Sequence, residues 1–346
     1  MALDRESLRQ IVQRNCDIAD ARFEPGFTIC VYLLKMREYF RWQRGFSYND
    51  PLPKELVSDW LGEQESYWET LEQEEFQSMA IAGEDFDPFQ SDAINARLNP
   101  HGLVYSGGYG HFCKPHFFLA ELVRRETYGD TEVYISGREL ARDLTAPSAM
   151  NLGDRVYLRG EALRRSVWER IENWRWSKAD NAMGRCLALY DLDTDTEAAL
   201  DRMSADQMHF VLWHELGEAR VSALLGNDWN TMLSSLPRTG TELMVRVVRD
   251  NLADCLVTVP ELVKDGRSKL IHGYFGTHSP MRRKMFPALE AAYDSWRAGG
   301  DIDELREVAE TGAKHWTRVA TDLISLFSTG GDPLPLLDAR LREATL

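Results

Sequence analysis

The segment Asp206–Glu218 places three ionisable side chains, His214, Glu215 and Glu218, in an otherwise largely apolar helical run. Burying a carboxylate is unfavourable unless a cation or a hydrogen-bond donor compensates it. Positions four apart share one face of a helix, so His214 and Glu218 point in the same direction. The pattern therefore predicts a helix that carries an imidazole and a carboxylate on its inward face.

A second helix is predicted at residues 240–259, and Asp250 and Asp254 lie four apart on it. Like charges at this spacing repel each other, so this pair also needs compensation. The connection at residues 226–238 is short enough to make the two helices an antiparallel hairpin. In such a hairpin, the aspartates could face the imidazole and the carboxylate of the first helix.

A divalent metal ion would compensate these converging charges. Helical bundles build metal sites from inward-facing carboxylates and imidazoles, and nitrogen and oxygen ligands without thiolate suit iron, manganese or zinc. The predicted ligands come from the two helices and are His214, Glu218, Asp250 and Asp254. Glu215 follows a ligand directly and is the candidate catalytic base.

Two further histidines, His272 and His278, lie downstream of this helix pair, in front of the helix start at Ser279 and Pro280. A loop that carries two histidines can close over a site, so both residues are candidate metal ligands. In the alternative interpretation they are ordinary loop residues that cap helices or contact solvent.

Arginines near the carboxylates allow a structural interpretation of the same segment. Arg220, Arg246 and Arg249 could form ion pairs with the acidic side chains, with His214 hydrogen-bonded in the core. The His-Glu-x-x-Glu pattern also lacks the second histidine of His-Glu-x-x-His, which defines the common zinc peptidases. A peptidase is therefore not predicted.

The periodicity of apolar residues predicts a mainly α fold with a small antiparallel β insert, which is the α+β class. Residues 1–100 are predicted as an N-terminal helical region, residues 101–160 as a glycine-rich β-containing region, and residues 161–346 as a C-terminal helical domain. The last region resembles a helical bundle and carries the candidate site. The clearest helical runs are residues 6–19, 27–44, 53–71, 161–176, 182–192, 205–225, 240–259, 280–298 and 302–327.

The glycine-rich segment Tyr105–His116 has two possible functions. Its glycines and Lys114 could cradle a phosphate, but their spacing matches neither the dinucleotide fingerprint nor the P-loop and favours a hairpin turn. His111, Cys113 and His116 could also bind a metal, although a cluster without a second half is a weak zinc pattern.

Charge and hydropathy exclude several classes of partner. The net charge of −15 repels nucleic acid and anionic lipid surfaces. The longest apolar stretch, Phe27–Leu34, is far shorter than the roughly 18 residues of a membrane span, and the first residues lack a secretion signal. The five cysteines are widely spaced, which favours a reducing cytoplasm. Those with apolar neighbours, predicted as small core residues, are Cys16, Cys30, Cys186 and Cys255.

Several stretches along the chain match those of a known family. They are Arg14–Arg22, Leu33–Trp42, Pro100–Gly108, Lys114–Leu119, Ser136–Asp143, His214–Glu218 and Asp250–Leu256. Over nearly its whole length, the chain resembles a family of bacterial, mostly proteobacterial, proteins that is defined only as a domain of unknown function. The resemblance implies a bacterial cytoplasmic protein and transfers no activity, cofactor or catalytic residue.

The leading hypothesis is a metal-dependent enzyme, of the hydrolase or the non-haem iron oxidase type, that acts on a small-molecule substrate. The alternative is a non-catalytic bacterial adaptor or assembly factor that binds a protein partner through its acidic surface. A third hypothesis is a small-molecule binder that uses the glycine-rich β region. None of these three hypotheses includes nucleic acid or a membrane as a partner.

Overall fold

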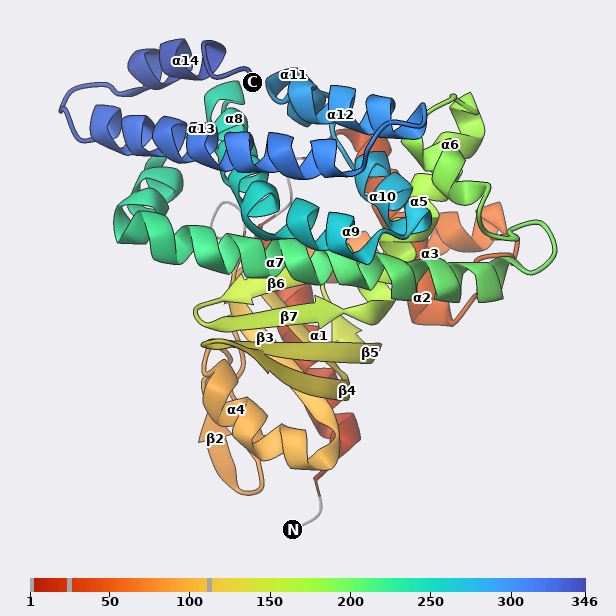
Figure 1. Ribbon diagram of the computed structural model, residues 1–346. Coiled ribbons are helices and arrows are strands. Elements are labelled where there is room, and N and C mark those ends of the chain that lie inside the picture. Colours follow the sequence, from red (N-terminus) through yellow and green to blue (C-terminus); the bar gives the residue numbers. More distant parts are fainter. Residues whose placement is uncertain (1–2, 24–26, 111–113) are drawn as a thin grey trace. The chain divides into compact units, whose positions relative to one another are not determined.

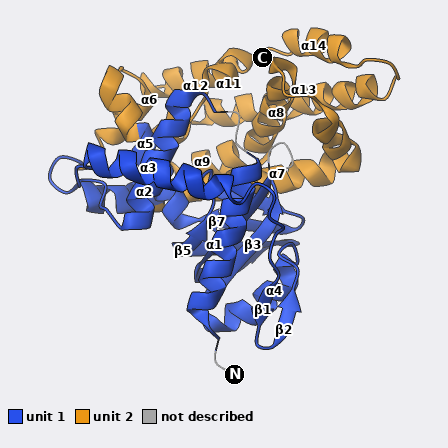
Figure 2. Ribbon diagram, turned by 180° about the vertical axis from the view of Figure 1, so that it is seen from behind, with its two compact units in different colours: residues 1–170, 192–204 blue, residues 171–191, 205–346 orange. Residues whose placement is uncertain are grey.

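The computed structural model describes residues 3–23, 27–110 and 114–346, and the chain divides into two compact units (Figures 1 and 2). Unit 1 comprises residues 1–170 and 192–204, and unit 2 comprises residues 171–191 and 205–346. Helices Gly160–Ser177 (α5) and Thr196–Ser235 (α7) each contribute to both units. The fold is mainly α with β elements, as the sequence predicts.

Unit 1 contains a five-stranded sheet with the strand order β3-β4-β5-β7-β6. Its strands are Leu103–Tyr109 (β3), Pro115–Tyr128 (β4), Thr131–Arg142 (β5), Ala149–Leu152 (β6) and Arg155–Arg159 (β7). Neighbouring strands are antiparallel except β5 and β7, which run parallel. The parallel pairing of β5 and β7 departs from the prediction of a purely antiparallel sheet. It arises because β7, the second strand of the β6–β7 hairpin, pairs with β5, whereas β6 lies at the edge of the sheet.

The remaining elements of unit 1 are mostly N-terminal helices. They are Arg5–Arg22 (α1), Ile29–Arg44 (α2), Lys54–Glu69 (α3), Ser91–Leu98 (α4), the 3-10 helix Asn99–His101 (η1), and the short hairpin Met79–Ile81 (β1) and Glu84–Phe86 (β2). Val12 and Cys16 of α1 pack against Phe117 and Leu119 on one face of the sheet. The other face of the sheet carries a second hydrophobic cluster, which includes Phe118.

The described parts of the glycine-rich segment lie in the paired antiparallel strands β3 and β4, with Gly108 opposite His116, as expected for the hairpin that the sequence favours. Gly107 donates its N–H to Ser91 of α4, and a Cβ at this position would lie 2.1 Å from the carbonyl oxygen of Pro88. The glycine thus serves close packing of the strand. His111 and Cys113 lie outside the described residues.

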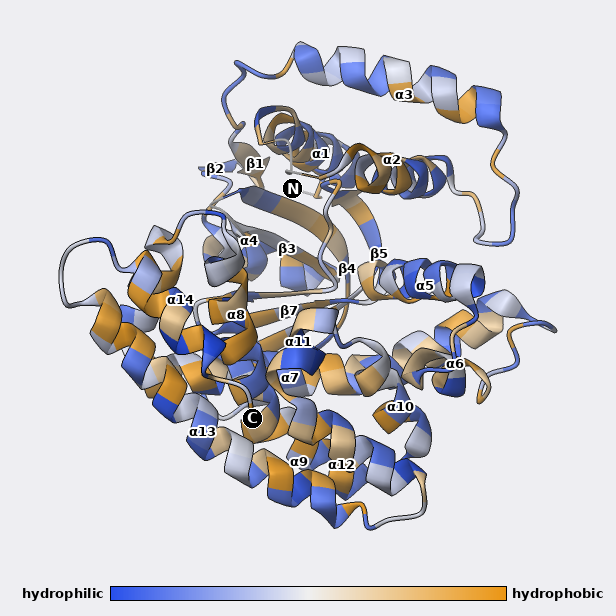
Figure 3. Cartoon of the chain, turned by 90° about the horizontal axis from the view of Figure 1, so that it is seen from above, coloured by the Kyte–Doolittle hydropathy of each residue, from blue (hydrophilic) through white to orange (hydrophobic). Residues whose placement is uncertain are grey.

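Unit 2 is helical. Besides parts of α5 and α7 it contains Ala182–Leu187 (α6), Gly240–Ala253 (α8), Val259–Asp265 (α9), Ser268–Gly276 (α10), Pro280–Met285 (α11), Pro287–Arg297 (α12), Asp303–Phe327 (α13) and Leu334–Arg342 (α14). Hydrophobic and hydrophilic residues alternate along α13 (Figure 3), and its inward side chains, such as Trp316, join one large core. In the described ranges, no helix has the length and apolar character of a membrane span.

Gly226 interrupts α7, because its φ of 70° and ψ of −167° are not helical. The predicted helix end at residue 225 therefore lies at this kink. The predicted connection is only partly right, because residues 227–235 are helical again. After α8, a π-helical turn, Asp254–Thr258, leads directly into α9, and Pro260 lies in the first turn of α9, where its missing N–H is tolerated.

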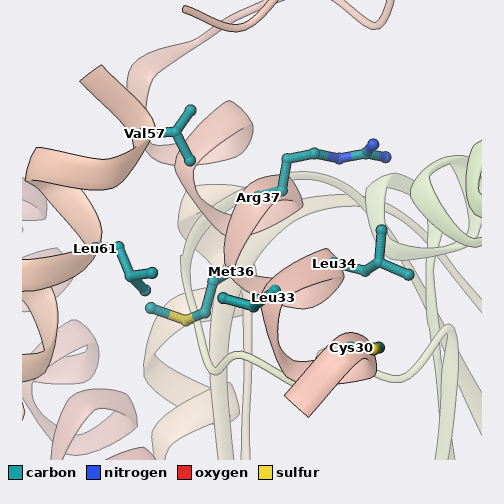
Figure 4. Close-up of a pocket in the computed structure, with 7 residues that line it drawn as sticks. All are labelled: Cys30, Leu33, Leu34, Met36, Arg37, Val57 and Leu61. Atoms are coloured by element: carbon teal, nitrogen blue, oxygen red, sulfur yellow. The ribbon is translucent and has the colours of Figure 1, made fainter. Parts of the chain in front are cut away.

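An apolar pocket of about 470 Å³ lies between α2 and α3 (Figure 4). Its lining residues are Cys30, Leu33, Leu34, Met36, Arg37, Val57 and Leu61. Cys30 is exposed, so its prediction as a core residue is wrong. The same prediction is confirmed for Cys16, Cys186 and Cys255, which are buried.

Candidate metal centre

A glycine brings α7 and α8 into close contact. A Cβ on Gly217 would lie 2.4 Å from the carbonyl oxygen of Ala253, so only glycine allows the two backbones to approach this closely. His214 and Glu218 lie on either side of Gly217 along α7. The contact therefore presents both side chains to the acidic residues of α8 and of the π-helical turn that follows it.

Three of the predicted ligands come together at this contact. One donor atom each from His214, Glu218 and Asp250 can be chosen so that all three lie within 4.8 Å of one another. Nε2 of His214 lies 3.4 Å from Oε1 of Glu218. All three side chains are half-buried, so a bound ion would be partly shielded and still reachable from solvent.

Asp254 touches the opposite nitrogen of the imidazole. Its Oδ1 lies 2.7 Å from Nδ1 of His214 and accepts a hydrogen bond of 2.6 Å from Oγ1 of Thr258. Its Oδ2 accepts hydrogen bonds from the Tyr274 hydroxyl, at 2.7 Å, and from Arg282. Both oxygens are thus engaged, and the bond to Nδ1 turns Nε2 toward Glu218. This is the arrangement in which a carboxylate orients a metal-binding histidine.

Charge stabilises this arrangement. Burial opposes protonation of His214, but the charge of Asp254 and the hydrogen bonds to Asp254 and Glu218 outweigh burial and hold the His214 pKa well above its ordinary value. Burial alone would raise the pKa of Asp254, whereas Arg282 and His214 hold it well below its ordinary value. Asp254 is therefore a buried anion over the whole physiological pH range.

Arg249 of α8 supplies a further positive charge. Its Nη2 lies 2.6 Å from Oε1 of Glu218 and 3.2 Å from Oδ1 of Asp250. Burial opposes the charge of Arg249, but Glu218 and Asp250 raise its pKa above the ordinary value. Arg249 thus forms an ion pair with Glu218, which is one of the arginine–carboxylate pairs that the structural interpretation of the sequence expects. Arg246 instead pairs with Glu242 on its own helix.

Comparison with known proteins gives two matches that together cover nearly the whole chain. Residues 7–159 match the N-terminal domain, and residues 164–343 the C-terminal domain, of a family of unknown function, DUF6866. The chain belongs to this family. No curated protein and no solved structure matches it. The candidate metal centre lies wholly within the C-terminal DUF6866 domain.

The other predicted site residues occupy different positions in this DUF6866 domain. Glu215 is half-buried beside the cluster, and burial together with the charge of Glu218 raises its pKa to about 8. His272 lies within α10, not in the predicted loop, and its Nδ1 is 2.8 Å from the Tyr293 hydroxyl. Nδ1 of His278 is 2.6 Å from Oε1 of Glu290. Neither histidine belongs to the three-residue cluster.

Three residues outside the predicted set of site residues hold Asp254 in place, namely Thr258, Tyr274 and Arg282. Thr258 lies four positions after Asp254, a spacing that could have drawn attention to it. Tyr274 and Arg282 come from α10 and α11, and no local pattern links them to Asp254. Their role follows only from the packing of these helices.

Proposed function

We propose that this protein is a metal-dependent enzyme whose divalent ion replaces the Nε2 proton of His214 and is bound by that nitrogen and by the carboxylates of Glu218 and Asp250. One observation carries the proposal: Nδ1 of His214 is bonded to the buried Asp254, while Nε2 faces a carboxylate on its own helix. Orientation of an imidazole by a carboxylate is the usual partner arrangement of metal-binding histidines.

The ligand set supports a catalytic more than a structural ion. Three protein ligands leave coordination positions for water and substrate, as in catalytic metal sites. One nitrogen and two carboxylate ligands without a thiolate suit manganese, iron or zinc. Zinc or manganese would activate water for hydrolysis of a small-molecule substrate, and iron would support an oxidase. Glu215 is the candidate general base, because it follows a ligand directly and is half-buried beside the cluster.

The cellular setting is part of the same proposal. The four cysteines within the described ranges, Cys16, Cys30, Cys186 and Cys255, are free thiols. Free thiols are typical of a reducing compartment, so we place the enzyme in the cytoplasm of a bacterium.

The first test is the metal content of the protein, purified without a histidine tag and without chelator, by plasma mass spectrometry. We expect near-stoichiometric iron, manganese or zinc in the wild type and background metal in His214→Ala. His209→Ala is the matched control, because His209 lies exposed on the same helix and should leave the metal content unchanged. Background metal in the wild type, persisting after anaerobic reconstitution with each ion, would refute the proposal.

The ion pairs of Arg249 favour a second candidate function. Because Arg249 already forms ion pairs with Glu218 and Asp250, the charged residues could serve only to join α7 and α8. The protein would then be a non-catalytic adaptor that binds a basic partner through its acidic surface. This candidate predicts background metal in every variant, together with a loss of stability in His214→Ala.

A further inference from the structure

Unit 1 contains three buried arginines whose donors are incompletely bonded. The side chains of Arg142, Arg159 and Arg165 have exposed fractions of 1%, 0% and 5%. Among the described residues, six of their nitrogens find no hydrogen-bond acceptor: Nε and Nη2 of Arg142, Nη1 and Nη2 of Arg159, and Nε and Nη1 of Arg165. A buried donor without an acceptor is unfavourable, and more so when it is charged. Such a group indicates a partner that the protein chain itself does not supply.

Two of these arginines lie on the same face of the sheet. Arg142 at the end of β5 is in register with Phe118 of β4, so their side chains share one face. The guanidinium carbon of Arg159, from β7, lies 4.4 Å from the centre of the Phe118 ring. Burial, together with the positive charges of Arg142 and Arg159 nearby, lowers the pKa of Arg165 to about 10.

The third arginine is held at the same end of β5. Nη2 of Arg165, from α5, donates to the carbonyl oxygens of Thr145, at 3.0 Å, and Ala146, at 2.5 Å. These carbonyls lie three and four residues after Arg142. This bonding orients one edge of the Arg165 guanidinium and leaves Nε and Nη1 for another partner.

Carboxylates near the three arginines do not use up these donors. Oε1 of Glu139 accepts from Nε of Arg159 at 2.6 Å. Glu169 is shared between Nε of Arg165 and Nζ of Lys35, each at 3.6 Å, which is beyond hydrogen-bond distance. No carboxylate in the described ranges forms an ion pair with Arg142, which instead lies over the rings of Tyr39 and Trp42.

Two other buried acids are already paired. Oδ1 of Asp20 lies 2.6 Å from Nζ of Lys114, and Oδ2 of Asp143 lies 2.8 Å from Nδ1 of His116. Asp143 also caps the backbone N–H of Ala146, and Asp20 that of Leu144. These acids are therefore committed to other donors.

A further carboxylate, Glu161, lies within electrostatic range of Arg142 and Arg159, and its Oε2 accepts a hydrogen bond from the backbone N–H of Glu139. With Lys35, the three arginines still outnumber the carboxylates Glu139, Glu161 and Glu169.

We propose that Arg142, Arg159 and Arg165 bind a tetrahedral oxyanion, either free phosphate or the phosphate group of a small molecule. The planar guanidinium donates pairs of parallel hydrogen bonds to such oxygens. A tetrahedral anion offers acceptors in several directions and can serve three guanidiniums, whereas a carboxylate offers two oxygens in one plane. Lys35, Trp42 and Tyr48 at the edge of the cluster are half-buried, so this edge is in contact with solvent.

Equilibrium dialysis of the full chain against radiolabelled inorganic phosphate tests the proposal. We expect saturable binding of one phosphate per chain. Phosphate should also raise the unfolding midpoint, compared with sodium chloride or acetate at the same ionic strength. A parallel arm with glycerol phosphate distinguishes the sources: binding at least tenfold tighter than that of phosphate identifies a phosphorylated metabolite, and equal or weaker binding identifies the free ion.

Arg142→Met and Arg138→Met form a matched pair on β5, because Arg138 is exposed and pairs with Glu121 on the surface. We expect phosphate affinity to fall at least tenfold in Arg142→Met and to be unchanged in Arg138→Met. The wild-type measurements decide the question even if Arg142→Met does not fold. Non-saturable binding by the wild type, or equal midpoint shifts with phosphate, acetate and chloride, would overturn the proposal and leave only water around these guanidiniums.

Discussion

The imidazole of His214 and the carboxylate of Asp254 lie 2.7 Å apart across the contact between α7 and α8. The two residues are forty positions apart in the chain, and Asp254 is fully buried. Their hydrogen bond joins the two helices and fixes the direction in which the other imidazole nitrogen points. Stability and the proposed metal site thus depend on the same pair.

Removing the carboxylate of Asp254 should destabilise unit 2. Asp254→Ala leaves Arg282 and His214 without their shared anion, and breaking a buried ion pair by deleting one partner costs about 3–5 kcal/mol. Urea unfolding followed by circular dichroism measures the change. Asp228→Ala is the control, because Asp228 is exposed on α7 and its loss should change the free energy of unfolding by less than about 0.5 kcal/mol. Equal stability of the two variants would contradict the assigned role.

Gly217→Ala should also lower stability, although alanine is the better helix former. The new Cβ would lie 2.4 Å from the carbonyl oxygen of Ala253, and separating the helices to admit it should cost about 1–3 kcal/mol. Gly62→Ala is a matched control in α3, because no atom lies within 4 Å of the added Cβ. There, alanine should stabilise by up to about 1 kcal/mol. Thermal unfolding compares the two variants, and effects of the same sign would contradict the close helix contact.

Asp17 should make unit 1 less stable as the pH rises. Burial raises the pKa of Asp17 to about 7. Hydrogen bonds from Trp68, Gln13 and Tyr39 lower the pKa but only partly offset the effect of burial. Because the folded state holds the Asp17 proton more tightly than the unfolded chain, stability is greatest below the unfolded pKa of 3.8. As the pH rises from 3.8 to about 7, the contribution of Asp17 to the free energy of unfolding falls by on the order of 4 kcal/mol.

The variant Asp17→Asn isolates this effect, because the amide oxygen can still accept the same hydrogen bonds without titrating. The free energy of unfolding of the wild type, measured by urea titration relative to the variant, should fall between pH 4 and pH 7. Asp59→Asn, at an exposed position of α3, should leave the pH profile as it is in the wild type. A wild-type profile parallel to that of Asp17→Asn would rule out the raised pKa.

Cys30 should react with iodoacetamide much faster than Cys16 in the native protein. Cys30 is exposed on α2, whereas burial raises the pKa of the Cys16 thiol well above its ordinary value, and the thiolate is the reactive form. Peptide mass spectrometry after brief labelling measures both residues separately. In denaturant the two rates should become similar, and similar rates in the native protein would contradict the placement of Cys30.

Local patterns predict most helices of this protein well. The predicted helices at residues 27–44, 53–71 and 302–327 correspond to Ile29–Arg44, Lys54–Glu69 and Asp303–Phe327. Each has a continuous amphipathic pattern, which depends only on neighbours along the chain. Strand β4, Pro115–Tyr128, is far harder to recognise. Its first six residues are all buried, so the alternation that marks a strand is absent there.

The candidate metal centre could be predicted in part. The ligand types and their i, i+4 spacing identify His214 and Glu218 as neighbours on one face, because helix geometry alone places them there. The distinction between ligand and orienting residue could not be predicted. Asp250 and Asp254 look equivalent in sequence, but Asp254 lies in a π-helical turn and is surrounded by donors from other helices. The assignment of ligands to these residues stays a prediction until metal is measured.

The amino-acid sequence by itself determined the mainly α character, the end of a helical segment at residue 225 and the helix that carries His214 and Glu218, because these depend on periodicity and on glycine within a short segment. Only the tertiary structure decided which charges meet. The bond between His214 and Asp254 requires α7 and α8 to touch at Gly217, and the cluster of Arg142, Arg159 and Arg165 requires two strands and a helix to pack together. Coulomb energies and hydrogen bonds depend on distance in space, and spacing along the chain does not specify that distance.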